Sequence, residues 1–191
     1  CPAACATTIA QNASVTLTAT PSTGANFQAW GGACSGTAAT CTVQMTAARA
    51  VTASFSTVNF PLTVTRAGAG TGTVTSAPAG ISCGTDCAES YAQNTAVTLT
   101  AAAGSGSLFS GWSGACTGTG SCSVTMSAAR NVTATFALAR TLTVAKAGTG
   151  AGTVTSAPAG INCGSTCAAS FADGSTVTLT AAATSGSTFG G

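Results

Sequence analysis

The chain contains no histidine, and only a small part of its 191 residues is charged: five are Lys or Arg and three are Asp or Glu. Without histidine no Ser-His or Cys-His relay can form, and no side chain ordinarily titrates near neutral pH. A carboxylate pair for acid and base catalysis would have to come from Asp86, Glu89 and Asp173. The equivalents of Asp86 and Glu89 in the later copy of the repeated segment are Thr166 and Ala169, so a carboxylate pair is not a property of the repeat, and the sequence predicts a protein that is not an enzyme.

The low charge also limits the partners that the chain can bind. A net charge of +2 spread over this length makes no basic patch, so we expect no binding to nucleic acid or to an anionic membrane. Thr, Ser, Gly or Asn interrupts every apolar run well before about 18 residues, and the sequence predicts no membrane span. A nearly uncharged surface favours self-association into a fibre or a longer array.

The most informative pattern is an internal repeat. The segment 62–109 returns as residues 142–189, since 142 − 62 = 80. An earlier copy begins at Cys1 and places Trp30 at an offset of 82 from Trp112. A fixed period of this length predicts a tandem array of small domains.

We divide the chain into three repeats on this basis. The first repeat (1–57) lacks its N-terminal strands, the middle repeat (58–138) is complete, and the third repeat (139–191) lacks its C-terminal strands. Two explanations stay open. Either the ends are truncations of a longer chain, or residues 140–162 of one copy complete residues 1–56 of the next by adding strands to an open sheet edge.

Apolar and small polar residues alternate through the middle repeat, which is typical of strands. The sequence predicts all-β, tandem small antiparallel domains with five or six strands each, and we interpret the glycine-rich segment 68–72 as a hairpin turn. The predicted strands cover residues 62–65, 72–75, 96–101, 123–126 and 131–136. One buried face should contain Val64, Val74, Val97, Leu99, Val124, Val132, Ala134 and Phe136.

The ten cysteines fall in local pairs. An even number at recurring spacings is typical of a disulfide framework in a secreted or cell-surface protein. Repeats of this size also depend on such staples, because they are small for a single hydrophobic core. The predicted disulfides are Cys1–Cys5, Cys34–Cys41, Cys83–Cys87, Cys116–Cys122 and Cys163–Cys167.

Zinc binding is the alternative use of these thiols. The spacings Cys-x3-Cys and Cys-x5-Cys differ from those of zinc ribbons, and no histidine is available as a ligand. We therefore expect disulfides, with no metal and no cofactor.

A longer motif recurs in two repeats. Phe109-x-x-Trp112-x-Gly-x-Cys116 is followed by Cys122-x-Val-x-Met126, and the same pattern covers residues 27–45. Over its whole length the chain resembles the divergent internalin-B-type bacterial repeat. Members of that family are small β domains in tandem within secreted or surface-bound bacterial proteins. The resemblance implies a spacer, stalk or adhesive scaffold without catalysis.

Trp30 and Trp112 are the only tryptophans, and each follows a phenylalanine in a glycine-rich segment. A ring in such a place can project and contact a surface glycan. The stronger interpretation is core packing, with Trp112 stacked on Phe109 and on the neighbouring disulfide.

The few cations also hold fixed places in the repeat. Arg66 is equivalent to Lys146, and Arg49 to Arg130. Each cation lies either at a solvated strand end or against a backbone carbonyl or the adjoining repeat.

These patterns favour an extracellular structural repeat protein. It would be a stalk or adhesin segment, or the subunit of a secreted filament, assembling through β-strand edges. The alternative is a carbohydrate-binding or adhesive surface module that uses Trp30 and Trp112.

Overall fold

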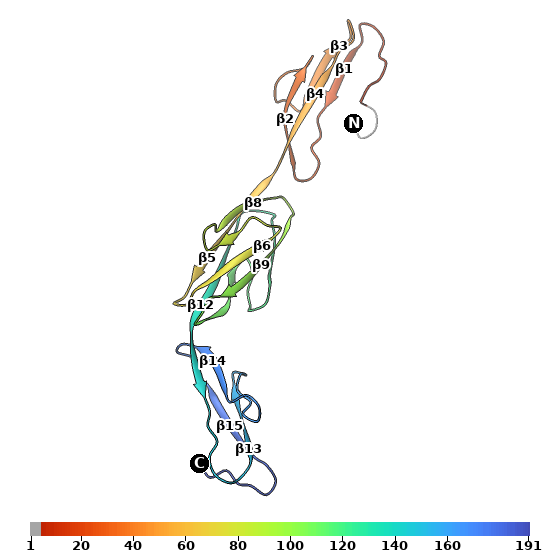
Figure 1. Cartoon of the computed structure of the whole chain (residues 1–191). Helices are drawn as coiled ribbons and strands as arrows, with labels where there is room; N and C mark the ends of the chain where they lie inside the picture. Colours follow the sequence, from red (N-terminus) through yellow and green to blue (C-terminus); the bar gives the residue numbers. More distant parts are fainter. Residues whose placement is uncertain (1–4) are drawn as a thin grey trace. The chain divides into compact units, whose positions relative to one another are not determined.

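The computed structural model describes residues 5–191, and all the regular structure in this range consists of β-strands (Figure 1). The prediction of an all-β chain is confirmed. The strands are β1 (Ser14–Thr18), β2 (Ala25–Gly32), β3 (Thr40–Gln44), β4 (Val51–Thr57), β5 (Asn59–Ala67), β6 (Gly72–Ala77), β7 (Ser82–Cys83), β8 (Ala88–Ala92), β9 (Ala96–Ala103), β10 (Ser107–Gly114), β11 (Cys122–Thr125), β12 (Arg130–Thr143), β13 (Gly152–Ala157), β14 (Ala168–Ala172) and β15 (Thr178–Ala183).

The described chain divides into two compact units. The first unit contains the first repeat together with two short segments, Tyr91–Thr95 and Met126–Ala128. The second unit contains Pro61–Ser90, Ala96–Thr125 and Ala129–Gly191.

The middle repeat consists of two sheets. One has the strand order β10-β12-β5-β8, and the other has the order β11-β9-β6-β7. The eight residues predicted to share a buried face are at most 3% exposed, which confirms their burial. They come from both sheets, however, so the core lies between the two sheets. Alternation alone could not show to which sheet each residue belongs.

One strand pair departs from the predicted antiparallel arrangement. Strands β5 and β12 run parallel, from Leu62 opposite Arg130 to Ala67 opposite Thr135. The first and the last strand of the middle repeat are therefore neighbours. Periodicity reports which side chains are buried but not strand direction, so the sequence could not predict this pair.

Strand β12 has 14 residues and serves two repeats. Its first half pairs with β10 and β5, and residues Ala139 to Thr143 pair antiparallel with β14 (Figure 1). No linker separates the two halves. The third repeat therefore begins on the same strand that completes the middle repeat.

The first and third repeats each contain part of this plan. In the first repeat β1 pairs with β3 and β2 pairs with β4, equivalent to the pairs β9 with β11 and β10 with β12. In the third repeat β13 pairs with β15 as β6 pairs with β9. Its core centres on Ile161, Cys163 and Phe171.

The glycine-rich segment 68–72 is not a hairpin turn, so that interpretation was wrong. It carries the chain from β5 in one sheet to β6 in the other. Glycine is required because a Cβ on Gly70 would overlap the backbone of Ala137, and a Cβ on Gly72 would overlap the ring of Phe136. The segment therefore covers the end of the core at van der Waals contact.

Candidate functional site

Four of the five predicted disulfides are confirmed. The short loops Cys83–Cys87 and Cys163–Cys167 each have a Cα–Cα distance of 4.2 Å. The other two are Cys34–Cys41 and Cys116–Cys122. The predicted partner of Cys5, Cys1, lies outside the described residues.

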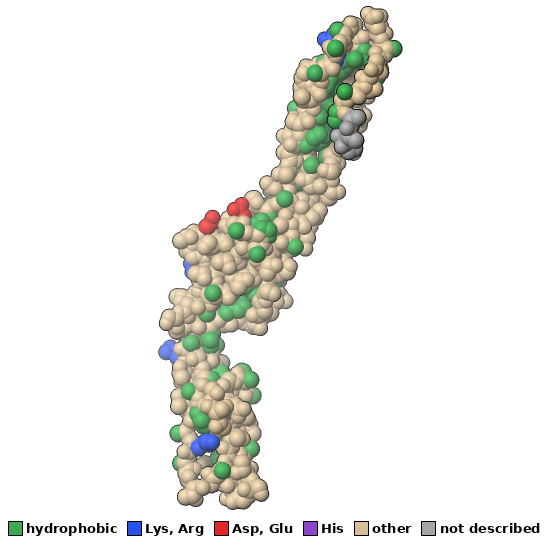
Figure 2. Space-filling view, turned by 45° about the vertical axis from the view of Figure 1, so that its right-hand side comes forward, with side chains coloured by type: hydrophobic (Ala, Val, Ile, Leu, Met, Phe, Trp, Pro, Cys, Tyr) green, Lys and Arg blue, Asp and Glu red, His purple; other side chains and the backbone are tan. Residues whose placement is uncertain are grey.

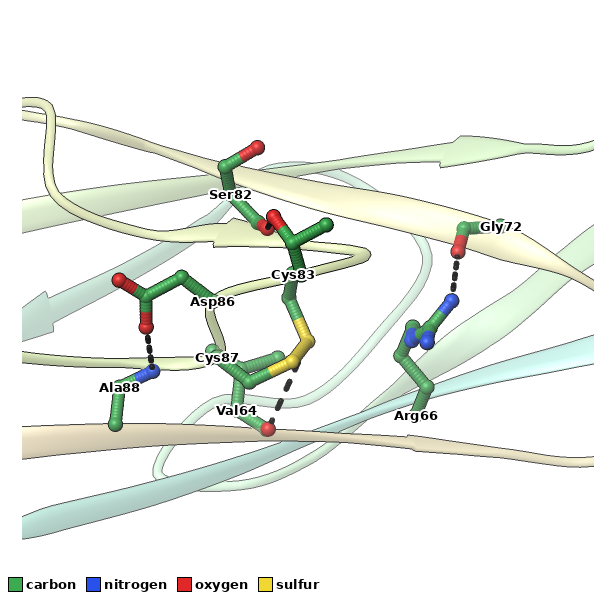
Figure 3. The surroundings of a disulfide bond; sticks show 9 residues. Val64, Arg66, Gly72, Ser82, Cys83, Asp86, Cys87 and Ala88 are labelled. Atoms are coloured by element: carbon green, nitrogen blue, oxygen red, sulfur yellow. Dashed lines mark hydrogen bonds between the residues drawn. A yellow bond between two sulfur atoms is a disulfide. The ribbon is translucent and has the colours of Figure 1, made fainter.

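The Cys83–Cys87 loop is fastened to β5 at Val64 (Figure 3). Val64 N donates a 2.8 Å hydrogen bond to Cys87 O, and Cys83 Sγ lies 3.8 Å from Val64 O. Within the loop, Asp86 Oδ1 accepts a 3.3 Å hydrogen bond from Ala88 N. Because Cys83 is fully buried, this disulfide is a part of the core as well as a loop closure.

The third repeat has the same arrangement. Val144 N donates a 2.7 Å hydrogen bond to Cys167 O, and Cys163 Sγ lies 3.9 Å from Val144 O. The disulfide loop therefore contacts the preceding part of the chain in the same way in the middle and third repeats.

Both tryptophans are buried beside a phenylalanine. Trp112 is 5% exposed and its ring centroid lies 4.9 Å from that of Phe109; Trp30 is 9% exposed and lies 5.2 Å from Phe27. Tilted contacts of this kind are favourable between aromatic rings. Each indole N–H is also used, since Trp112 Nε1 donates to Gly120 O at 2.7 Å and Trp30 Nε1 donates to Ala38 O at 2.8 Å.

Both indoles are therefore largely buried, although Trp30 also lines a groove of the first repeat. Glycan binding through Trp30 and Trp112 stays a prediction, and the burial of both rings favours a packing role.

Two equivalent cations contact backbone carbonyls, as one of the two interpretations predicted. Arg66 Nη1 donates to Gly72 O at 2.8 Å, which Figure 3 shows, and Lys146 Nζ donates to Gly152 O at 3.0 Å. Each cation thus contacts the far end of a glycine-rich segment, Arg66 from within β5 and Lys146 from just beyond β12. Arg49 instead donates to Thr46 Oγ1 at 2.8 Å.

Each acid makes a contact of its own: Asp86 accepts from Ala88 N, Glu89 from Ser90 N and Asp173 from Arg140. Asp173 Oδ1 accepts a 2.8 Å hydrogen bond from Arg140 Nε, and this contact raises the pKa of Arg140 above its ordinary value. Both side chains are largely exposed, so the pair contributes little to stability. Among the residues described, no three Cys, Asp or Glu side chains are grouped to hold a metal ion.

A groove in the first repeat, lined by apolar side chains together with Thr18, Thr20 and Arg49, was not predicted from the sequence. It has a volume of about 800 Å³ and lies between the pair β1 and β3 and the pair β2 and β4. Its lining includes Val15, Leu17, Val43, Met45, Val51 and Phe55. Figure 2 shows hydrophobic side chains at the surface of this repeat and very few charged ones.

Equivalence between repeats could have identified the groove. Phe55 aligns with Phe136, but Phe55 is 47% exposed and Phe136 is 1% exposed. A core phenylalanine of the repeat therefore lies at the surface in one copy.

Comparison with known protein families gives one match. The family model of the divergent InlB B-repeat domain matches residues 3–59 and 62–140, well over half of the chain. No curated protein and no solved structure matches the chain. The described part of the chain contains no helix that is long and apolar enough to span a membrane.

Proposed function

Because this chain belongs to the divergent InlB B-repeat domain family, we propose that it is an extracellular structural repeat protein. It acts as a stalk or adhesin segment, or as the subunit of a secreted filament, and its repeats extend one another through β-strands. Its role in each case is that of a structural spacer.

The observation that carries this proposal is the double use of β12. The first half of the strand closes the middle repeat against β5 and β10, and the second half opens the third repeat against β14. Asp173 N, just beyond β14, also donates a 2.8 Å hydrogen bond to Leu138 O on the same strand. A junction made of paired backbone resists bending far better than a flexible linker, which suits a spacer.

The disulfides and the composition support a location outside the cell. Structural disulfides persist in oxidising compartments, and each repeat in this chain contains at least one of the four observed. Small domains with short local disulfides also tolerate the harsh conditions outside a cell, because the staples limit the unfolded state.

We also propose that the chain has no catalytic function. Asp86 accepts a hydrogen bond within a turn and Asp173 forms a surface ion pair, and a composition without histidine offers no side chain that ordinarily titrates near neutral pH. The same scarcity of charge supports the absence of nucleic acid among its partners.

Insertion of a flexible linker tests the spacer role. A Gly-Ser insertion after Leu138 separates the two halves of β12, and an equal insertion in the exposed turn at Gly148 is the matched control. We expect small-angle scattering of the monomer to show a wider distribution of dimensions for the first variant only. A wild-type chain as flexible as the Leu138 insertion variant would contradict the proposal.

Location is tested separately. Bacteria that naturally produce the protein should bind an antibody against residues 58–138 without being permeabilised. Labelling only after permeabilisation would contradict an extracellular role.

A further inference from the structure

A pocket opens at one end of the core of the middle repeat, where the chain passes from β5 to β6. It has a volume of about 460 Å³, and its lining includes Val64, Arg66, Cys87, Phe136 and parts of the glycine-rich segment 68–72. All of the lining residues belong to the middle repeat, which is preceded and followed by another repeat in this chain. We call this site the Arg66 pocket.

Arg66 occupies a core-facing position of β5. Residues two apart on a strand share a face, and Leu62 and Val64, which precede Arg66 in this series, are buried. Arg66 also lies opposite Ala134, a fully buried residue of β12. The side chain therefore starts on the core side of the sheet, and Figure 3 shows it on the same side of β5 as the Cys83–Cys87 disulfide.

The Arg66 guanidinium has donors in reserve. Nη1 donates to Gly72 O at 2.8 Å, a contact that uses one of the five N–H donors of the group. In the described part of the chain the one ion pair is Arg140–Asp173, so no carboxylate of these residues neutralises Arg66. The side chain is exposed, and an anion from solution can therefore reach it.

The lining limits the kind of ligand that the Arg66 pocket can hold. Val64 and Phe136 are buried apolar side chains, Cys87 brings the disulfide to the wall, and Arg66 is the one charged side chain among the lining residues. A guanidinium fork matches the two oxygens of a carboxylate. A phosphate dianion would leave one of its charges without a partner. The volume is in the usual range of small-molecule pockets.

We propose that the Arg66 pocket binds a small carboxylic acid in its ionised form. The carboxylate receives N–H donors from Arg66, and a short apolar stem contacts Val64, Phe136 and the disulfide. This is a binding function in addition to the proposed spacer role, which does not depend on it.

The third repeat separates the structural use of this cation from its use as an anion site. Lys146 is equivalent to Arg66 and makes the same contact, since its Nζ donates to Gly152 O at 3.0 Å. An ammonium group therefore fulfils the structural role of the position. It has no planar fork for a carboxylate, so Arg66→Lys should keep the contact with Gly72 O and lose the bidentate contact with a ligand.

Butyrate is the probe that tests the site, and butyramide, which has a similar size and no charge, is the control ligand. Amide chemical shifts are followed by NMR in the full, oxidised chain. We expect butyrate to shift the amide resonances of Val64, Ala67 and Cys87 in a saturable way, and butyramide to leave them unchanged. Equal shifts with both ligands, or no saturable shift with butyrate, would overturn the proposal.

Two conservative variants show whether the guanidinium of Arg66 is responsible. We expect Arg66→Lys to weaken butyrate binding at least about tenfold, as for the loss of a hydrogen bond to a charged group, with an unchanged thermal midpoint. Arg140→Lys makes the same chemical change at an arginine that does not line the pocket, and it should bind butyrate like wild type. Wild-type affinity in Arg66→Lys would mean that the residue is only a structural brace.

A chain terminus also carries a carboxylate, and a second ligand distinguishes this source. An acetylated tripeptide that ends in valine should bind more weakly than butyrate, because the pocket accommodates a short stem. Tighter binding of the tripeptide would overturn the assignment to a small free acid.

Discussion

Trp112 Nε1 donates a 2.7 Å hydrogen bond to Gly120 O, and Gly120 lies within the loop that the Cys116–Cys122 disulfide closes. The indole therefore connects the core to a stapled loop. Trp30 repeats this relationship with Ala38, which lies within the Cys34–Cys41 loop.

Trp112→Ala should destabilise the middle repeat by about 3 to 5 kcal/mol, the range for removal of a large buried aromatic side chain. Trp112→Phe keeps a ring and loses the hydrogen bond, so it should cost clearly less. Chemical denaturation followed by circular dichroism measures both variants. Equal stability of Trp112→Ala and wild type would show that the indole is not a core residue.

Soluble sugars should leave tryptophan fluorescence unchanged, because both indoles are nearly buried and both N–H groups are bonded. Titration with a panel of mono- and oligosaccharides tests this expectation. Saturable quenching that Trp30→Phe or Trp112→Phe removes would favour the carbohydrate-binding alternative.

The double variant Cys83→Ala, Cys87→Ala should lose about 2 kcal/mol from loop entropy alone, because the closed loop is short. Because Cys83 is fully buried, its truncation also leaves a cavity, so the total loss should exceed the loop-entropy figure. The matched variant Cys116→Ala, Cys122→Ala should lose a similar amount, since Cys122 is also almost fully buried. Urea unfolding measures both double variants, and a loss at Cys83 and Cys87 no larger than the loop-entropy figure would contradict the core role of that disulfide.

Equivalent phenylalanines should respond differently to truncation. Phe136→Ala removes a buried ring that contacts Phe109, and should cost about 3 to 5 kcal/mol. Phe55→Ala removes a half-exposed ring, and in dilute, monomeric protein it should cost much less. Similar losses in thermal unfolding at low concentration would mean that Phe55 is covered within its own chain.

The sequence predicted the fold class and all four observed disulfides because alternation and cysteine spacing are local signals. It did not predict β8 or β10, since β8 places the charged Glu89 on the same face as buried Tyr91 and residues 107–114 include two glycines, which weakens the period-two pattern. The parallel neighbours β5 and β12 lie far apart in sequence, and no local pattern reports such a pairing. The role of glycine in segment 68–72 depends on Phe136, which only the folded chain brings close.

The parallel pair also determines how a repeat carries tension. The chain enters the middle repeat along β5 and leaves along β12, and six residue pairs connect these neighbours side by side. A pull on the two ends therefore drags the strands past each other lengthwise. Their hydrogen bonds share the load and must break together, whereas an antiparallel hairpin pulled from its open end would unzip one bond at a time. The middle repeat therefore resists a pull on its two ends by shear between β5 and β12.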